Sequence, residues 1–382
     1  KKKYLNLNWK YWLSLCCLVV LTAFTGITGI IQARAEEGKP APTEFAHITS
    51  CTVENGKQVS IKGQMEGTWS DSAYYDNYLY LFEMKPYQRD LKGRTDYCAW
   101  ITKGDALNFQ TPLNLGTEQD ALCSSYVVAV YDGSEYTIVS NEAYITNPES
   151  VAKYTDAYKS AQTKKGLLIQ TTPAMLSDAF SLGVNHVIVN IPFNHILGSG
   201  IDYQYDGKTY HFSEDVLAVY DDTIRRMSEK NMTVTAVILN GWSDSTPQLY
   251  YPGVTKQPAS RANYYGFNVA TQEGYETVRA IASFLADRYG SLKSPYGRVS
   301  NWVIGNEINN QLWNYMGPMS LDQYVEEYQR AFRVFYTAIK STSANSRVFF
   351  STDYNWNYDA DGSLKYNAKD VIDTFNNKMI PG

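Results

Sequence analysis

Apolar and polar residues follow two different patterns along the chain. In the first part, short segments alternate with a period of two or are rich in strand-forming side chains, which is typical of half-buried strands. These segments are residues 58–64, 78–84, 125–131 and 135–139. Asp132-Gly133 joins the last two segments and is a strong hairpin signal. With no convincing amphipathic helix between them, residues 45–148 are predicted to form a β-sandwich domain.

The second part of the chain alternates strand and helix patterns. Five short apolar runs have the composition of buried parallel strands. They cover residues 166–170, 187–191, 233–239, 302–304 and 347–351. Helical periodicity follows each run, over residues 173–182, from Ser213, over 275–289, from Ser320 and from about Asn367. Five successive βα units predict a parallel sheet in residues 149–382.

Helix boundaries carry specific signals. Ser213 precedes an acidic first turn, and Ser320 with Gln323 has the spacing of a capping box. Gly183 and Gly290 follow the last apolar positions of their helices, where glycine commonly ends a helix.

The N-terminal region has the pattern of a targeting segment. Residues 1–10 carry four lysines, residues 11–31 are mostly apolar, and Ala33-Arg34-Ala35 resembles a cleavage site. Residues 1–35 are therefore expected to be a signal peptide, and the alternative is an uncleaved membrane anchor through residues 11–33. Both alternatives place the protein outside the cytoplasm, secreted or at the cell surface. Residues 36–44 are proline-rich and are expected to be a linker.

Composition and cysteine spacing argue against several classes of function. The 382 residues carry a net charge of −5, and scattered basic residues exclude a nucleic-acid footprint. Beyond the targeting segment, Cys51, Cys98 and Cys123 are compatible with one disulfide and a free thiol or with three buried thiols. Their spacing argues against a zinc site. No phosphate loop, metalloprotease helix or serine elbow is present, so neither a metal nor a cofactor is expected.

The candidate chemistry lies at the end of the fourth apolar run. Trp302-Val303-Ile304 leads into Gly305, Asn306 and Glu307. Ligands of α/β folds bind at the carboxyl ends of parallel strands. An acid at this position can transfer a proton, and the neighbouring amide can hold a sugar hydroxyl. The alternative interpretation is that Glu307 is a solvated charge that opens a loop.

From about residue 165 onward, the chain resembles the clan A glycoside hydrolases. The resemblance rests on Asn306-Glu307 at the end of a fourth strand and on the order of elements. It implies a (β/α)₈ TIM-type barrel, with Glu307 as general acid/base and Asn306 bonded to the sugar 2-hydroxyl. The layout of leader, β-domain and barrel also looks like a bacterial family of unknown function, family 5722.

The resemblance further implies a carboxylate nucleophile at the end of a seventh strand. About five βα units precede Gly382, so the chain is expected to be truncated, with the nucleophile beyond that residue. The alternative is that the chain closes as an unusual fold of its own. Asp353 is the only acid in this chain that is expected to face Glu307.

Polar and aromatic residues follow other strands and are candidates for substrate binding. They are Asn194 and His195, Asn240 and Trp242, Trp313, and Asp353 with Trp356. Packing of the loops is an equally good explanation for each of them. The long segment of residues 240–271 is expected to form a wall of the cleft.

These observations predict a secreted or surface-tethered glycoside hydrolase that cleaves a β-linked polysaccharide or oligosaccharide with retention of configuration. The first alternative is a non-catalytic carbohydrate-binding protein on the same barrel. The second is a surface scaffold that binds no glycan. Aromatic residues at strand ends favour the first two hypotheses over the third.

Overall fold

The computed structural model describes residues 45–65, 76–104, 106–357 and 364–379. These residues belong to one compact unit. The expected signal peptide and linker lie outside the described residues. Within the described ranges, no helix is both long enough and apolar enough to cross a membrane.

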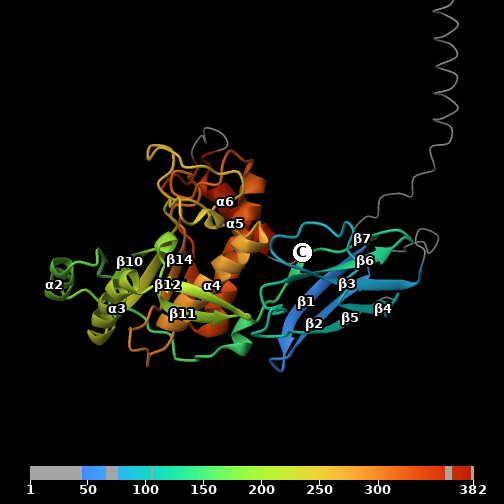
Figure 1. Cartoon of the computed structure of the whole chain (residues 1–382), viewed down its shortest axis with the longest axis horizontal. Coiled ribbons are helices and arrows are strands. Elements are labelled where there is room, and N and C mark those ends of the chain that lie inside the picture. Colours follow the sequence, from blue (N-terminus) through green and yellow to red (C-terminus); the bar gives the residue numbers. More distant parts are fainter. Residues whose placement is uncertain (1–44, 66–75, 105, 358–363, 380–382) are drawn as a thin grey trace, which may run out of the picture. The chain divides into compact units, whose positions relative to one another are not determined.

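Two antiparallel sheets form the first part of the described chain (Figure 1). One has the order β1-β2-β5, with β1 at Ala46–Glu54, β2 at Gln58–Met65 and β5 at Ala106–Pro112. The other has the order β4-β3-β6-β7, with β4 at Ala99–Thr102, β3 at Tyr78–Met84, β6 at Ser125–Tyr131 and β7 at Tyr136–Ile138. A short strand β8, Ala143–Tyr144, also pairs with β6.

Alternating side chains of the two sheets share one apolar core. Ile61 of β2, Phe109 of β5, Leu81 of β3 and Val128 of β6 are all buried in it. The predicted strands are present, and the Asp132-Gly133 signal does join β6 to β7, with Gly133 at a φ of 98°. Leucine, valine and phenylalanine at every second position therefore account for the way these sheets pack.

The cysteines of this region are free thiols, which resolves the two alternatives left open by the sequence. Burial raises the pKa of Cys51 to about 12 and that of Cys123 to about 11. The pKa of Cys98 is also raised to about 11, again mainly by burial. All three are therefore protonated and unreactive at neutral pH.

The second part of the chain contains a five-stranded parallel sheet. Its strands lie side by side in chain order: β9 (Gly166–Ile169), β10 (His186–Pro192), β13 (Thr233–Leu239), β14 (Asn301–Ile304) and β15 (Arg347–Phe349). The helices that alternate with them are α2 (Pro173–Leu182), α3 (Glu214–Glu229), α4 (Gln272–Tyr289), α5 (Leu321–Thr342) and α6 (Ala368–Met379). The five predicted strands and five predicted helices are all present, and the fold is mixed α/β with several sheets.

The register of the parallel sheet positions the loops that carry the candidate residues. Ile238 of β13 pairs with Ile304 of β14, and Val303 pairs with Phe349 of β15. The chains that leave these three strands therefore emerge next to each other at one edge. Helices α4 and α5, which follow β13 and β14 in the chain, pack against each other (Figure 1).

The helix caps explain where the helices begin. The Ser320 side chain accepts a hydrogen bond from Gln323 N, and the Gln323 side chain accepts one from Ser320 N, so the predicted capping box is present. Helix α4 begins at Gln272, three residues before the predicted start, because Thr271 accepts a hydrogen bond from Gly274 N. The caps thus outweigh the apolar stripe in setting the first turn.

Gly290 ends α4, but its backbone is right-handed, with a φ of −86°. Glycine therefore ends this helix as expected, without the left-handed backbone that is common at such positions. Glycine is required there by contact, since a Cβ atom would lie 2.4 Å from the Ala286 carbonyl oxygen.

One hairpin was missed in the sequence. Strands β11 (Gly200–Tyr205) and β12 (Lys208–Ser213) pair in antiparallel fashion before α3. Asp206 and Gly207 form the turn with φ values of 48° and 76°. Asp-Gly between two tyrosine-rich runs is the usual signal for such a turn, and it was available in the sequence. Three short 3₁₀ helices complete the described elements: η2 (Pro148–Val151), η3 (Phe193–His195) and η4 (Pro247–Leu249).

Two buried arginines connect the helices of the α/β part to residues of other elements. Arg279 of α4 makes ion pairs with Asp120, at 3.0 Å, and with Asp206, at 2.7 Å. Arg330 of α5 pairs with Glu142 at 2.7 Å. Loss of one partner from such a buried pair leaves an uncompensated charge, so removal of either partner is expected to destabilise the fold.

We predict that Ser320→Ala lowers the free energy of unfolding by about 1 kcal/mol, because the first turn of α5 loses its capping acceptor. Chemical denaturation monitored by circular dichroism measures this change. Ser341→Ala, in the last turn of the same helix, is the matched control and should change stability by less than about 0.5 kcal/mol. Equal effects of the two substitutions would contradict the role given to the cap.

Candidate active site

The backbone changes direction immediately after β14. Gly305 donates its N–H to Ile238 O at 3.1 Å and has a φ of 76°. Two residues later, Glu307 has a φ of 43°, which is uncommon for a residue with a side chain. Asparagine and aspartate tolerate such a backbone in turns, but a glutamate with this φ is more unusual and is a candidate for a functional role. Glu307 is therefore the first residue to consider at this edge of the sheet.

Hydrogen bonds from neighbouring elements fix this part of the backbone. Ser351, just after β15, accepts the Glu307 N–H with its side chain at 3.0 Å and the Ile308 N–H with its carbonyl at 2.9 Å. From α5, the Tyr328 hydroxyl donates to Ile304 O, and the Tyr324 hydroxyl donates to Ile308 O, both at 2.7 Å. The base of the Glu307 side chain is thus held by a neighbouring strand and a helix.

The Glu307 carboxyl is partly buried, and its environment favours the protonated form. Burial raises the pKa of Glu307, and the negative charge of Asp353 raises it further. Among the described residues, no group donates a hydrogen bond to this carboxyl that would stabilise its ionised form. Glu307 can therefore carry a proton at a pH where an ordinary glutamate has lost it.

The Asp353 carboxylate has the opposite environment. It accepts hydrogen bonds from Asn309 Nδ2 at 2.7 Å, from Asn355 N at 2.9 Å and from Asn355 Nδ2 at 2.8 Å. Burial acts to raise the pKa of Asp353, but these N–H donors outweigh burial and hold the pKa below its ordinary value. Asp353 in turn donates its own N–H to Asn309 Oδ1 at 2.8 Å, which ties the two loops together.

The two strand ends thus present one carboxyl group that tends to keep its proton and one that remains ionised. Two acids whose environments drive their pKa values apart can divide the roles of proton donor and fixed negative charge. Asn306, next to Glu307, is partly exposed, and its amide makes no hydrogen bond within the described residues. The arrangement is suited to proton transfer.

The candidates that follow β10 and β13 lie at the same edge of the sheet, but the side chains of Asn194 and Asn240 make hydrogen bonds to the backbone of the loops. Asn194 is buried and accepts the Gly241 N–H with Oδ1 at 3.0 Å. Asn240 is also buried and donates through Nδ2 to Leu249 O at 3.1 Å. His195, in contrast, is exposed.

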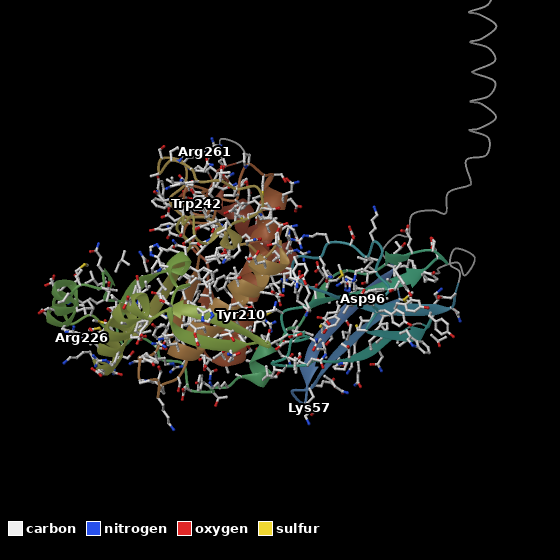
Figure 2. All side chains as sticks on the ribbon, viewed as in Figure 1. Lys57, Asp96, Tyr210, Arg226, Trp242 and Arg261 are labelled. Atoms are coloured by element: carbon white, nitrogen blue, oxygen red, sulfur yellow. The ribbon has the colours of Figure 1, made fainter. Side chains whose placement is uncertain are left out.

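The aromatic candidates differ in how much of each ring is exposed to solvent. Trp242 stacks on Tyr250, with ring centroids 4.3 Å apart, and donates from Nε1 to Asp244 at 2.7 Å. Figure 2 shows Trp242 and Arg261 in the same loop region, which belongs to the segment between β13 and α4. Trp313 is partly exposed, with its ring centroid 6.1 Å from that of Tyr264. Trp356 is 57% exposed and follows β15 closely, so it has the most ring surface free for a ligand.

Sequence reasoning missed the residues that hold the acids. Ser351, Asn309 and Asn355 make no motif, and their roles follow from the pairing of β14 with β15. The available signal was weak: Asn309 lies two positions after Glu307, and Asn355 lies two positions after Asp353.

The described cavities lie away from Glu307. The largest, about 590 Å³, is lined by residues such as Tyr154, Tyr203 and Asp287. A second described cavity contains the acids Asp206 and Glu276, but they form ion pairs with Arg279 and Lys208. The strand ends therefore remain the better candidate for chemistry. In the part of the chain that the structure describes, no cluster of three His, Cys, Asp or Glu side chains can hold a metal ion.

Residues 157–381 match a family described as a family of unknown function, DUF5722. The chain belongs to this family. This result confirms the membership expected from the layout of the sequence. No curated protein matches the chain.

Solved structures similar to this DUF5722 member are glycoside hydrolases. A trimodular endoglucanase of subfamily GH5_4 is 11% identical, with a TM-score of 0.35, over 61% of this chain and 38% of that one. A GH5 lichenase from Caldicellulosiruptor sp. F32 is 15% identical, with a TM-score of 0.32, over 52% and 57% of the two chains. A family 1 β-glucosidase from Thermotoga maritima is 15% identical, with a TM-score of 0.32, over 52% and 39%. This chain spans less than two thirds of each, and TM-scores below 0.5 do not define its fold or activity.

We predict that Gly305→Ala lowers the free energy of unfolding by more than about 1 kcal/mol. A side chain at a φ of 76° is strained, and the new Cβ atom would lie 3.1 Å from Asn314 Oδ1 and 3.3 Å from Ile308 Cγ2. Gly317→Ala is the matched control, because its φ of 94° is also positive but nothing lies within 4 Å of its Cβ position. Thermal or chemical denaturation compares the two, and a smaller cost at Gly305 would contradict the account.

We also predict that Asp353→Asn lowers the pKa of Glu307, because it removes the negative charge that disfavours ionisation. Carbon-13 NMR of labelled glutamate side chains measures this pKa directly and needs no substrate. Asp373→Asn, in α6, removes the same charge from a residue that is paired with Lys369, and it should leave Glu307 unchanged. An unchanged Glu307 pKa in Asp353→Asn would show that the two groups are not coupled.

Proposed function

We propose that this protein cleaves glycosidic bonds in a polysaccharide or oligosaccharide, with Glu307 as general acid/base. One observation carries the proposal: a carboxyl with a raised pKa lies at the end of β14, coupled to an ionised aspartate at the end of β15. A glycosidic oxygen is a poor leaving group, so its departure needs an acid that is still protonated near neutral pH. Glu307 has the environment for that task.

In the proposed reaction, the Glu307 carboxyl gives its proton to the glycosidic oxygen as the bond to the anomeric carbon breaks. The resulting carboxylate then takes a proton from the water that attacks the anomeric carbon, which restores the acid. Asn306 is proposed to orient the sugar through its 2-hydroxyl. Trp356, His195, Trp242 and Trp313 are proposed to line the substrate site, with Asn194 and Asn240 supporting its loops.

Retention of configuration requires a second carboxylate about 5 to 5.5 Å from the acid, acting as nucleophile. Both oxygens of Asp353 already accept hydrogen bonds from asparagine N–H groups. These bonds favour an electrostatic role for Asp353, which keeps Glu307 protonated, over attack on the sugar. We propose that the nucleophile comes from another strand end of a (β/α)₈ barrel to which residues 149–382 contribute.

The wider organisation is part of the same proposal. Residues 45–148 are proposed to be a β-sandwich domain, which the two antiparallel sheets with one shared core support. The chain-ordered parallel sheet supports a barrel arrangement for the rest. Secretion, or display at the cell surface, through residues 1–35 is proposed from the sequence of that segment.

Glu307→Gln is predicted to lower glycan hydrolysis by at least a hundredfold, since glutamine cannot donate the proton and general acid catalysis contributes roughly 10²–10⁴-fold. Reducing-end release from a panel of polysaccharides and oligosaccharides measures the activity. Glu54→Gln, at a partly exposed site of β1, is the control and should retain full activity. A fully active Glu307→Gln variant would overturn the assignment, and a folded wild-type protein inactive on the whole panel would favour a non-catalytic glycan-binding protein.

The pH dependence of the rate is a separate prediction. The proton donor is the protonated form of Glu307, so the rate falls as the pH rises through the raised pKa of this residue. Asp353→Asn should move this alkaline limb to lower pH. An alkaline limb that moves to higher pH, or not at all, would contradict the proposed coupling.

A further inference from the structure

The sheet β4-β3-β6-β7 has an aromatic outer surface that the proposed reaction does not use. Along β3, Leu79 and Leu81 point into the core shared by the two sheets, so the alternate residues point to the opposite side. On that side, the rings of several strands and of the β3–β4 loop contact one another. We call this surface the aromatic face, and it consists of Tyr78, Tyr80, Phe82, Tyr97, Trp100, Tyr131 and Tyr136.

Ring-to-ring contacts make the aromatic face a preformed surface. Tyr136 lies at the centre of the group, with ring centroids 5.0 Å from Tyr80, 4.9 Å from Phe82 and 4.8 Å from Tyr131. At the edge, Tyr78 meets Trp100 at 5.0 Å. Below the rings, Phe82 is fully buried in a small apolar cluster with residues such as Val127 and Ala129. Little side-chain freedom is left to lose when a ligand binds.

The rings that remain accessible form a small patch. Trp100 is 55% exposed, Tyr97 is 40% exposed and Tyr78 is 38% exposed. With about 150–250 Å² for each aromatic side chain, these three rings offer roughly 300 Å². A stable protein–protein interface needs about 800 Å² from each partner, so the patch is too small for such an interface. It is wide enough for a few sugar rings.

The basic side chains Arg94 and Lys103 beside the aromatic face have partners. Arg94 pairs with Asp96 at 2.9 Å, and Asp96, labelled in Figure 2, belongs to the loop between β3 and β4. The Asp76 carboxylate accepts a hydrogen bond from the Tyr80 hydroxyl at 2.6 Å, and its carbonyl accepts one from Lys103 Nζ at 2.5 Å. The described residues therefore present no excess of positive charge for nucleic acid or anionic lipid. A neutral ligand matches this charge distribution.

We propose that the aromatic face binds a neutral polysaccharide chain at a site separate from Glu307. The C–H faces of sugar rings pack on tyrosine and tryptophan rings, while sugar hydroxyls bond to the phenol and indole polar groups at the ring edges. A neutral, rigid surface of limited area that combines apolar faces with polar edges is suited to such a chain. The β-domain would then hold the protein on its polymer independently of catalysis.

Affinity electrophoresis of the complete chain in gels that contain soluble neutral polysaccharides tests the proposal. We expect retardation of the wild type and of Glu307→Gln, and at least a tenfold weaker affinity for Trp100→Ala and for Tyr78→Ala. Trp356→Ala removes an exposed tryptophan of the proposed substrate site and separates binding there from binding at the aromatic face. Phe349→Ala is the matched control, since it removes an aromatic ring that is 44% exposed and belongs to neither site, and it should bind like the wild type. Near-ultraviolet circular dichroism checks that each variant is folded.

Four outcomes would overturn the proposal. They are wild-type affinity in Trp100→Ala and Tyr78→Ala, loss of binding only in Trp356→Ala, no retardation of the wild type in any neutral glycan, and a dimer of this chain that Trp100→Ala dissociates. Light scattering after gel filtration measures the last of these. The proposed hydrolysis is tested separately, by the loss of turnover in Glu307→Gln. Retention in the gel measures binding alone.

Discussion

The parallel pairing of β14 between β13 and β15 is the constraint on which the candidate site depends. It places the ends of three strands side by side, so that residues more than forty positions apart in the chain can share hydrogen bonds. Ser351 can then hold the backbone of Glu307, and Asn309 can hold the carboxylate of Asp353. The left-handed backbone at Gly305 and Glu307 turns the chain out of the sheet at the point where these contacts form.

From this arrangement follows the electrostatic difference between two chemically similar acids. Asp353 receives three N–H donors and stays ionised, whereas Glu307 receives none among the described residues and lies near a fixed negative charge. Neither property belongs to the amino acid type alone. The asparagine N–H donors lower the pKa of Asp353, whereas burial and the charge of Asp353 raise that of Glu307. The residues that hold the two loops are therefore part of the proposed chemistry.

Most of the fold was predictable because its signals are local. Apolar runs identified all five parallel strands, and the capping box at Ser320 and the hairpin at Asp132-Gly133 formed as predicted. The start of α4 was misplaced because the Thr271 cap outweighs the apolar stripe, and the hairpin at Asp206-Gly207 was overlooked. The supports of Glu307 and Asp353 were not predictable, since Asn309 and Ser351 acquire their roles only through strand pairing. The aromatic face was hidden for the same reason, because its rings come from four strands and a loop.

Dependence on the leaving group in Glu307→Ala tests the central claim most directly. If Glu307 protonates the glycosidic oxygen, the variant should lose hydrolysis of natural glycans but keep activity on aryl glycosides whose phenol departs without a proton. Steady-state rates on a series of aryl glycosides with different leaving-group pKa values measure this. A steep dependence that is absent from the wild type is the predicted result. An equal loss on all substrates, in a variant that remains folded, would contradict the assignment of Glu307 as the general acid.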